Sequence, residues 1–257
     1  MRQKLLLRLC LLMLSSPGCA VYRPMQCAAP AVQDKGQVEV TGNAYFNTRL
    51  NGGVNYSPVR HFLVRAALDG KGDNNDSTYS RIAQYELAVG TYWPLGKRVL
   101  LGALGGVGQA HSQVGYSDTK YFVAGGGTYS YEQHRYDARY NKYFGEAYGA
   151  VQLSPAFSLG FAYRLTQVQF VGLTDQGQPL NLRSMLRGEP MLFVRGAFGN
   201  GPRGERPLYA QFGCGGSRLL STRPGQTGTG SESNLLKPNS YFTLGLGFFP
   251  AALFRRP

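Results

Sequence analysis

The stretch AFSLGFAYRLTQVQF, residues 156–170, alternates between two kinds of side chain. One set is large and apolar, and the other is small or polar: Phe157, Leu159, Phe161, Tyr163 and Leu165 against Ser158, Gly160, Ala162, Arg164 and Thr166. Successive side chains of a β-strand point to opposite faces. The alternation therefore predicts a strand with one apolar and one polar face.

The same alternation recurs through most of the chain. It predicts ten candidate strands: 37–47, 50–57, 61–69, 80–93, 98–111, 138–153, 156–171, 189–199, 207–217 and 239–249. Their connections are alternately short and long, and the long ones are polar: 70–79, 112–137, 172–188 and 218–238. Short periplasmic turns and longer external loops are typical of bacterial outer-membrane barrels. We therefore expect an all-β fold, an antiparallel up-and-down transmembrane β-barrel of about ten strands, with eight to twelve allowed.

The polar face of these strands carries charge, which decides between a membrane barrel and a soluble one. Six charged residues fall on this face: Glu39, Arg65, Glu86, Glu146, Arg164 and Arg195. They would make a poor dry core, so we place them in a lumen behind an apolar exterior. We expect a charge network that fills the lumen, since an isolated buried charge is costly. Two alternatives remain open: a narrow passive pore for small polar or anionic solutes, and a soluble periplasmic or surface β-sandwich binding module.

Composition excludes several other classes. Charged residues make up 16% of the chain, against roughly 25% in an ordinary soluble domain. Glycine accounts for 35 of the 257 residues, about twice its usual share of roughly 7%. A disordered chain, a coiled coil and a collagen-like repeat are excluded. The net charge is +13, and we expect contact with outer-membrane lipid and lipopolysaccharide, which are anionic. The basic residues are scattered and form no cluster, so we expect no nucleic acid. The four cysteines form no CxxC, and we expect no disulfide framework, metal or cofactor.

The N-terminus has the pattern of an export signal. Basic residues precede an apolar run that ends in small residues and Cys19. We expect a signal peptide over residues 1–18 and lipidation of Cys19, with cleavage after Ala20 as the alternative. The remaining domains are a periplasmic tether over 19–36, the barrel over 37–249 and a tail over 250–257.

Two segments, 139–170 and 189–196, are similar to outer-membrane barrel proteins of Bacteroidota. The layout of a lipoprotein-like signal, a proline-containing tether and a barrel is similar too. The end of the chain, 241–249, loosely resembles the terminal strand that barrel-assembly machinery recognises. The resemblance implies a Gram-negative outer membrane, a barrel and a functionally uncharacterised protein. It brings no catalytic residues.

Catalytic chemistry has little support in the sequence. We expect His61, His111 and His134 to be ordinary solvated side chains and the protein not to be an enzyme, although a hydrolase at the outer rim using His111 or His134 stays conceivable. The candidate extracellular binding surface consists of loop tyrosines, which combine contact area with a polar tip: Tyr116, Tyr121, Tyr129, Tyr131 and Tyr136. The expected role is structural or interaction-based, and we expect a monomer.

Overall fold

The computed structural model describes residues 21–72, 78–96, 98–122, 128–199, 206–224 and 235–251; side chains of 118–132 and 224 lie outside the described part. Ten antiparallel strands close into a barrel. They are β1 (Val38–Tyr45), β2 (Leu50–Tyr56), β3 (Leu63–Lys71), β4 (Tyr79–Leu95), β5 (Val99–Phe122), β6 (Thr128–Ser154), β7 (Phe157–Asp175), β9 (Leu182–Phe198), β10 (Leu208–Pro224) and β11 (Asn239–Phe248). The short β8 (Gln178–Pro179) pairs with the end of β7 only.

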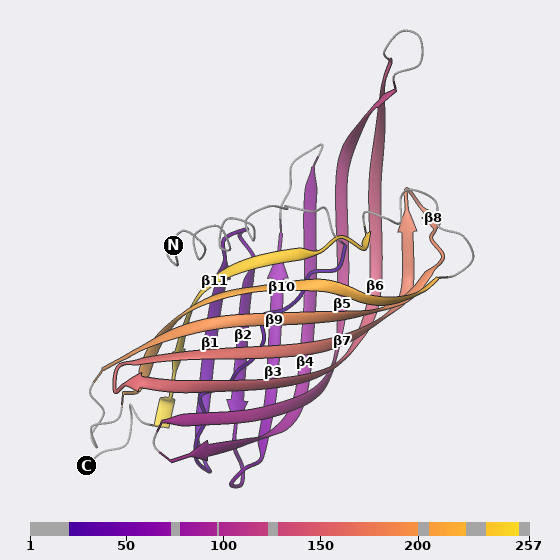
Figure 1. The fold of residues 1–257 in the computed structure, drawn as a ribbon. Helices are drawn as coiled ribbons and strands as arrows, with labels where there is room; N and C mark the ends of the chain where they lie inside the picture. Colours follow the sequence, from indigo (N-terminus) through magenta and orange to yellow (C-terminus); the bar gives the residue numbers. More distant parts are fainter. Residues whose placement is uncertain are drawn as a thin grey trace, which may run out of the picture.

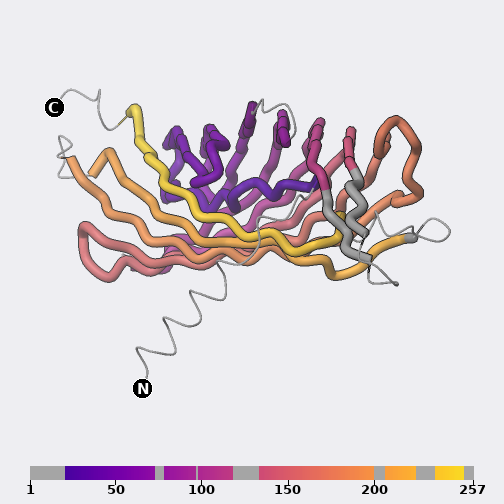
Figure 2. The backbone as a smooth tube through the Cα atoms, turned by 90° about the horizontal axis from the view of Figure 1, so that it is seen from above, coloured from indigo at the N-terminus to yellow at the C-terminus, as the bar shows by residue number. Residues whose placement is uncertain are grey.

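Each strand pairs with its neighbours in the chain, and β1 closes the ring by pairing with β11. In Figure 1, β1–β6 form one wall, and β7, β9, β10 and β11 cross in front of them. Figure 2 shows the same ring from above, with the two walls facing each other. The barrel has two different ends. We call the end with connections 72–78, 123–127, 176–181 and 225–238 the long-loop end, and the other the short-turn end.

The two faces of the barrel wall follow the predicted alternation. Outward Leu68 and Leu246 are 69% and 63% exposed, whereas inward Arg164 is 1% exposed. Several outward aromatic side chains gather where strands meet the short-turn end: Tyr56, Phe62, Trp93, Phe157 and Phe198. An apolar exterior with an aromatic girdle and a polar interior is the pattern of an outer-membrane barrel. The soluble sandwich alternative is wrong, because the sheet closes on itself. Within the described part of the chain, no helix has the length and apolarity for a membrane crossing.

Six of the ten strands, β4, β5, β6, β7, β9 and β10, are longer than the sequence analysis predicted. β5 continues to Phe122 and β6 starts at Thr128, so most of the expected 112–137 loop is a paired hairpin, which rises above the other strands in Figure 1. β9 and β10 likewise run into the expected loops 172–188 and 218–238. Strand pairing continues past the apolar belt because backbone hydrogen bonds do not require apolar side chains. The short link at Thr48, where φ is +65°, is a tight turn at the long-loop end.

The prediction that differs most from the structure is the periplasmic tether over residues 19–36. Its described part passes through the barrel, and we call residues 21–32 the lumen segment. Its buried apolar side chains are between 0% and 2% exposed: Val21, Tyr22, Met25, Cys27, Ala29 and Val32. These apolar side chains occupy the space between the charged walls, which is why the segment lies inside. Of the other predicted regions, residues 1–20, with Cys19, and 252–257 lie outside the described part.

A plugged lumen lined by paired charges

The lumen segment runs from the long-loop end to the short-turn end. Val21 and Tyr22 pack in an apolar cluster with Leu182 and Leu235, beside the long connections. Further along, Ala29 and Val32 pack in a second cluster that includes Leu63, Tyr92 and Leu100 near the short turns. The Gly36 amide then donates to the Ser57 carbonyl in the turn after β2. The segment therefore spans the barrel lengthwise.

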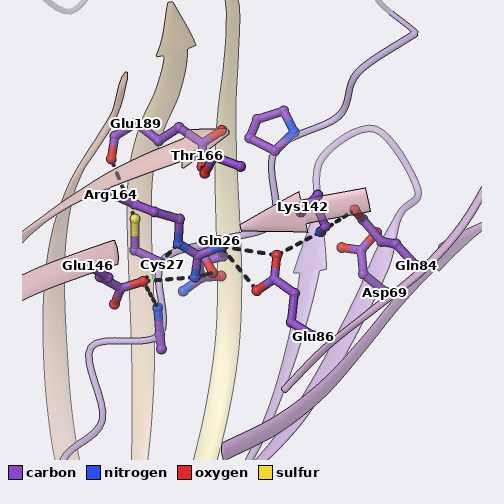
Figure 3. Close-up of polar contacts among 12 residues, drawn as sticks. Gln26, Cys27, Asp69, Gln84, Glu86, Lys142, Glu146, Arg164, Thr166 and Glu189 are labelled. Atoms are coloured by element: carbon purple, nitrogen blue, oxygen red, sulfur yellow. Dashed lines mark hydrogen bonds and ion pairs between the residues drawn. The ribbon is translucent and has the colours of Figure 1, made fainter. Parts of the chain in front are cut away.

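Four charged side chains form a cluster in the middle of the lumen, shown in Figure 3. An Arg164 Nη2 to Glu146 Oε2 distance of 2.7 Å joins β7 to β6, and an Arg164 Nη1 to Glu86 Oε2 distance of 3.1 Å joins β7 to β4. Lys142 Nζ lies 2.7 Å from Glu86 Oε1. We call Glu86, Lys142, Glu146 and Arg164 the central charge cluster. Lys142 and Glu146 share the inward face of β6 because they are an even number of residues apart.

This cluster binds the backbone of the lumen segment. Glu146 accepts hydrogen bonds from the amides of Ala28 and Ala29 at 3.1 and 3.0 Å. Arg164 Nη2 donates to the Gln26 carbonyl at 3.4 Å. A segment without a strand partner has backbone groups that are costly to bury unpaired. Here the charged wall supplies their partners.

Further contacts hold the segment between the middle of the lumen and the long-loop end. Tyr22 Oη donates to Glu189 Oε1 at 2.6 Å, and Thr166 also donates to Glu189 at 3.1 Å. Arg49 Nη2 donates to the Pro24 carbonyl at 2.6 Å, and its guanidinium lies 3.3 Å from Asp69. The same guanidinium stacks on the ring of Tyr45, 3.6 Å from the centroid.

A second polar group holds the segment near the short-turn end. Arg195 donates to the Ala29 carbonyl and, at 2.6 Å, to Gln211 Oε1. Glu39 accepts from the Ala31 amide at 3.0 Å and from Tyr209 Oη at 2.6 Å. The segment is thus bonded to the wall at each level that it passes.

The space left beside the segment is uneven. A cavity of about 10 Å³ lies next to Cys27 and Gln26, which is room for about one water molecule. At the short-turn end a vestibule of about 510 Å³ is lined by Arg98, Arg195 and Arg206 among other residues. Inside the described barrel, buried charges are nearly balanced: six bases (Arg49, Arg65, Lys142, Arg164, Arg187 and Arg195) and five acids (Glu39, Asp69, Glu86, Glu146 and Glu189).

The structure places all six predicted network residues inside, each 6% exposed or less. It joins Glu86, Glu146 and Arg164 directly. Glu39 and Arg65 meet through the amide of Asn55, at 2.7 and 3.0 Å. Arg195 stands with Gln211, outside the central charge cluster.

Sequence reasoning missed other members of the lining. They are Arg49, Asp69, Lys142, Arg187 and Glu189. Counting every second residue from Glu146 finds Lys142, and the same count from Arg195 finds Glu189 and Arg187. Arg49 lies in a turn, where alternation gives no signal.

The predicted tyrosine surface is only partly described. Tyr116 and Tyr136 point inward and are 9% and 1% exposed, so neither is displayed to solvent as expected. Both lie against the ring of His134. The side chains of Tyr121, Tyr129 and Tyr131 lie outside the described part.

The histidines are not ordinary solvated side chains either. His134 is buried, and its Nδ1 lies 2.7 Å from Asp175 Oδ2. His61 Nδ1 lies 2.7 Å from the Tyr92 carbonyl. His111 Nε2 lies 3.0 Å from Asp137 Oδ1 on the outer wall. In the described ranges, no group of three or more His, Cys, Asp or Glu could hold a metal ion.

The His111–Asp137 pair lies beyond the apolar belt. The outward face of β5 changes from Leu101 and Val107 to Gln109 toward the long-loop end, and Asp137 is further out still. Partial burial opposes ionisation of Asp137, but hydrogen bonds from Gln113 and His111 outweigh it and hold the pKa of this carboxyl below its usual value. The pair is a charge-assisted contact on an exposed surface.

A closed ring, an apolar exterior with an aromatic girdle and a charged interior together define an outer-membrane β-barrel. No family model matches the chain, and no curated protein matches it. Among solved structures, the translocator domain of the autotransporter NalP from Neisseria meningitidis is 12% identical, with a TM-score of 0.44 over 82% of this chain and 86% of that one. A NanC porin is 11% identical, with a TM-score of 0.35 over 82% of this chain and 98% of that one.

The outer-membrane protease OmpT from Escherichia coli is also similar, at 10% identity and a TM-score of 0.48 over 83% of this chain and 93% of that one. The expectation that the chain is not an enzyme does not hold as stated, because a protease is among the barrels of similar fold. At such low identities all three likenesses concern the fold alone.

Proposed function

We propose that the protein is an outer-membrane β-barrel with a structural or surface-interaction role, whose lumen is closed by its own N-terminal segment. The observation that carries this proposal is the lumen segment bonded to the charged wall at each level. The alternative of a narrow pore for polar or anionic solutes needs an open path past Cys27, where the cavity measures about 10 Å³. If the lumen is closed as proposed, the arginine-lined vestibule at the short-turn end is a closed pocket and not the mouth of a pore.

Conductance across planar bilayers tests the closure. The purified full-length protein is expected to insert without current steps. A variant lacking residues 21–32 is expected to give current steps, and the matched control lacking 252–257 is expected to stay silent. Each protein is first checked for a band that shifts on heating in SDS gels, which reports a folded barrel. Current steps from the full-length protein would contradict the proposal.

The proposed partners follow from the outer wall and the chain ends. A hollow of about 840 Å³ on this wall is lined by Leu50 and Leu68 together with His111 and Arg139. Apolar and basic groups side by side suit the acyl chains and phosphates of lipopolysaccharide. Barrel-assembly machinery would recognise the terminal strand β11, and a monomer suffices because the ring is closed.

Placement in a Gram-negative envelope of Bacteroidota type, with lipid attached to Cys19, rests on the sequence resemblance and the signal pattern. The apolar exterior of the barrel supports the membrane part of this placement. Incorporation of radiolabelled palmitate into the protein, lost in Cys19→Ala, tests the lipid.

A further inference from the structure

The direction of the lumen segment determines where the N-terminus leaves the barrel. Contacts along the segment follow one order. Tyr22 packs with Leu182 and Leu235 at the long-loop end, and Pro24 bonds to Arg49 in the turn at that end. Ala29 bonds to Glu146 and Arg195, and Ala31 bonds to Glu39 near the start of β1. The chain then reaches the short turns at Gly36 and reverses into β1. The segment starts in the cluster at the long-loop end and finishes in the cluster near the short turns, so it passes through the lumen once.

Val21 lies where this passage begins. It belongs to the apolar cluster with Tyr116, Leu182 and Leu235, all at the long-loop end. A chain advances at most about 3.6 Å per residue, so residues 19 and 20 stay within about 7 Å of Val21. The short-turn end is out of their reach. The described chain therefore begins among the long loops.

We infer that the mature N-terminus of this protein stands at the cell surface, carried there through its own barrel. Longer loops of outer-membrane barrels face the outside, so this inference rests on the proposed placement in the outer membrane. A lipid on Cys19 would then enter the outer leaflet from the external side. A periplasmic tether would instead have held the lipid in the inner leaflet.

A single-cysteine labelling experiment tests the direction. The background carries Cys19→Ala, Cys27→Ser and Cys214→Ser and is exported through a standard cleavable signal that leaves residue 19 as the first residue. Cys27→Ser keeps a donor for the Glu189 carbonyl, which the Cys27 sulfur reaches at 3.5 Å. Into this background we place Ala20→Cys and, as matched controls, Gly72→Cys at the long-loop end and Ala251→Cys beyond β11 at the short-turn end. A Cβ at Gly72 meets no atom within 4 Å.

Intact cells are treated with a polymer-linked maleimide too large to pass porins, and labelling is read as a gel shift of the folded protein. Ala20→Cys is expected to shift as fully as Gly72→Cys, whereas Ala251→Cys shifts only after the outer membrane is permeabilised. Labelling of Ala20→Cys only after permeabilisation, with Gly72→Cys still labelled in intact cells, would overturn the inference alone. Labelling of Ala251→Cys but not Gly72→Cys in intact cells would overturn the proposed placement as well.

Discussion

Removal of the Arg164 charge should destabilise the barrel strongly. The guanidinium pairs with Glu146 at 2.7 Å and with Glu86 at 3.1 Å, and it is 1% exposed. In Arg164→Met, Glu86 keeps Lys142 at 2.7 Å, so its charge stays compensated. Glu146 keeps the amides of Ala28 and Ala29, which carry no formal charge. Breaking a buried pair from one side costs about 3–5 kcal/mol, and we expect a loss of that size.

The double variant Arg164→Met/Glu146→Gln separates lost attraction from an uncompensated charge. With no carboxylate left unpaired, the double variant should unfold at higher urea than Arg164→Met alone, with a coupling energy of about 2 kcal/mol. Unfolding of protein refolded into lipid vesicles can be followed by the fluorescence of Trp93, the one tryptophan in the chain, which faces outward and is 45% exposed.

Arg183→Met, on the exposed face of β9, serves as the control and should change stability by less than about 0.5 kcal/mol. A loss below about 1 kcal/mol in Arg164→Met, or a double variant as unstable as the sum of the singles, would refute the reasoning.

Two further predictions concern packing and pH. A Cβ at Gly247 would lie 2.1 Å from the Tyr209 ring, so Gly247→Ala should displace that ring from Glu39 and cost about 1–3 kcal/mol in the same urea assay. Gly42→Ala, with open space at its Cβ, should cost clearly less, and equal losses would contradict the packing argument. Asp137 has a folded pKa below its unfolded value. Its ionised form therefore adds stability above roughly pH 4, and this stability is lost as pH falls through the folded pKa. The stability difference between the wild-type protein and Asp137→Asn should shrink at low pH, and a constant difference would refute the assignment.

The strands could be predicted from the sequence because alternate side chains of a strand face the lumen and the lipid, and the two faces carry different residue types. Glu39, Arg164 and Arg195 could be placed inside by counting parity alone. The length of the β5–β6 hairpin could not be predicted, since polar residues such as Gln113 and Asp137 look alike in a loop and in a paired strand above the membrane.

The sequence of the lumen segment contains no pattern that predicts its position inside the barrel. Pro24 and Pro30 exclude regular strand pairing, and its apolar residues follow no period. Its position depends on partners more than a hundred residues away, such as Glu146 and Glu189. Only the closed ring brings those partners to it, so a local pattern could not have revealed the plug.

The enclosure of this segment constrains the order of folding. The ring closes where β1, which directly follows the segment, pairs with the last strand β11, from Val40–Phe248 to Tyr45–Thr243. After closure, the segment could enter only by threading lengthwise between walls that bury its side chains almost completely. The segment must therefore lie on the open sheet before the seam forms. The remaining strands then pair around the lumen segment, and the β1–β11 seam completes the barrel over it.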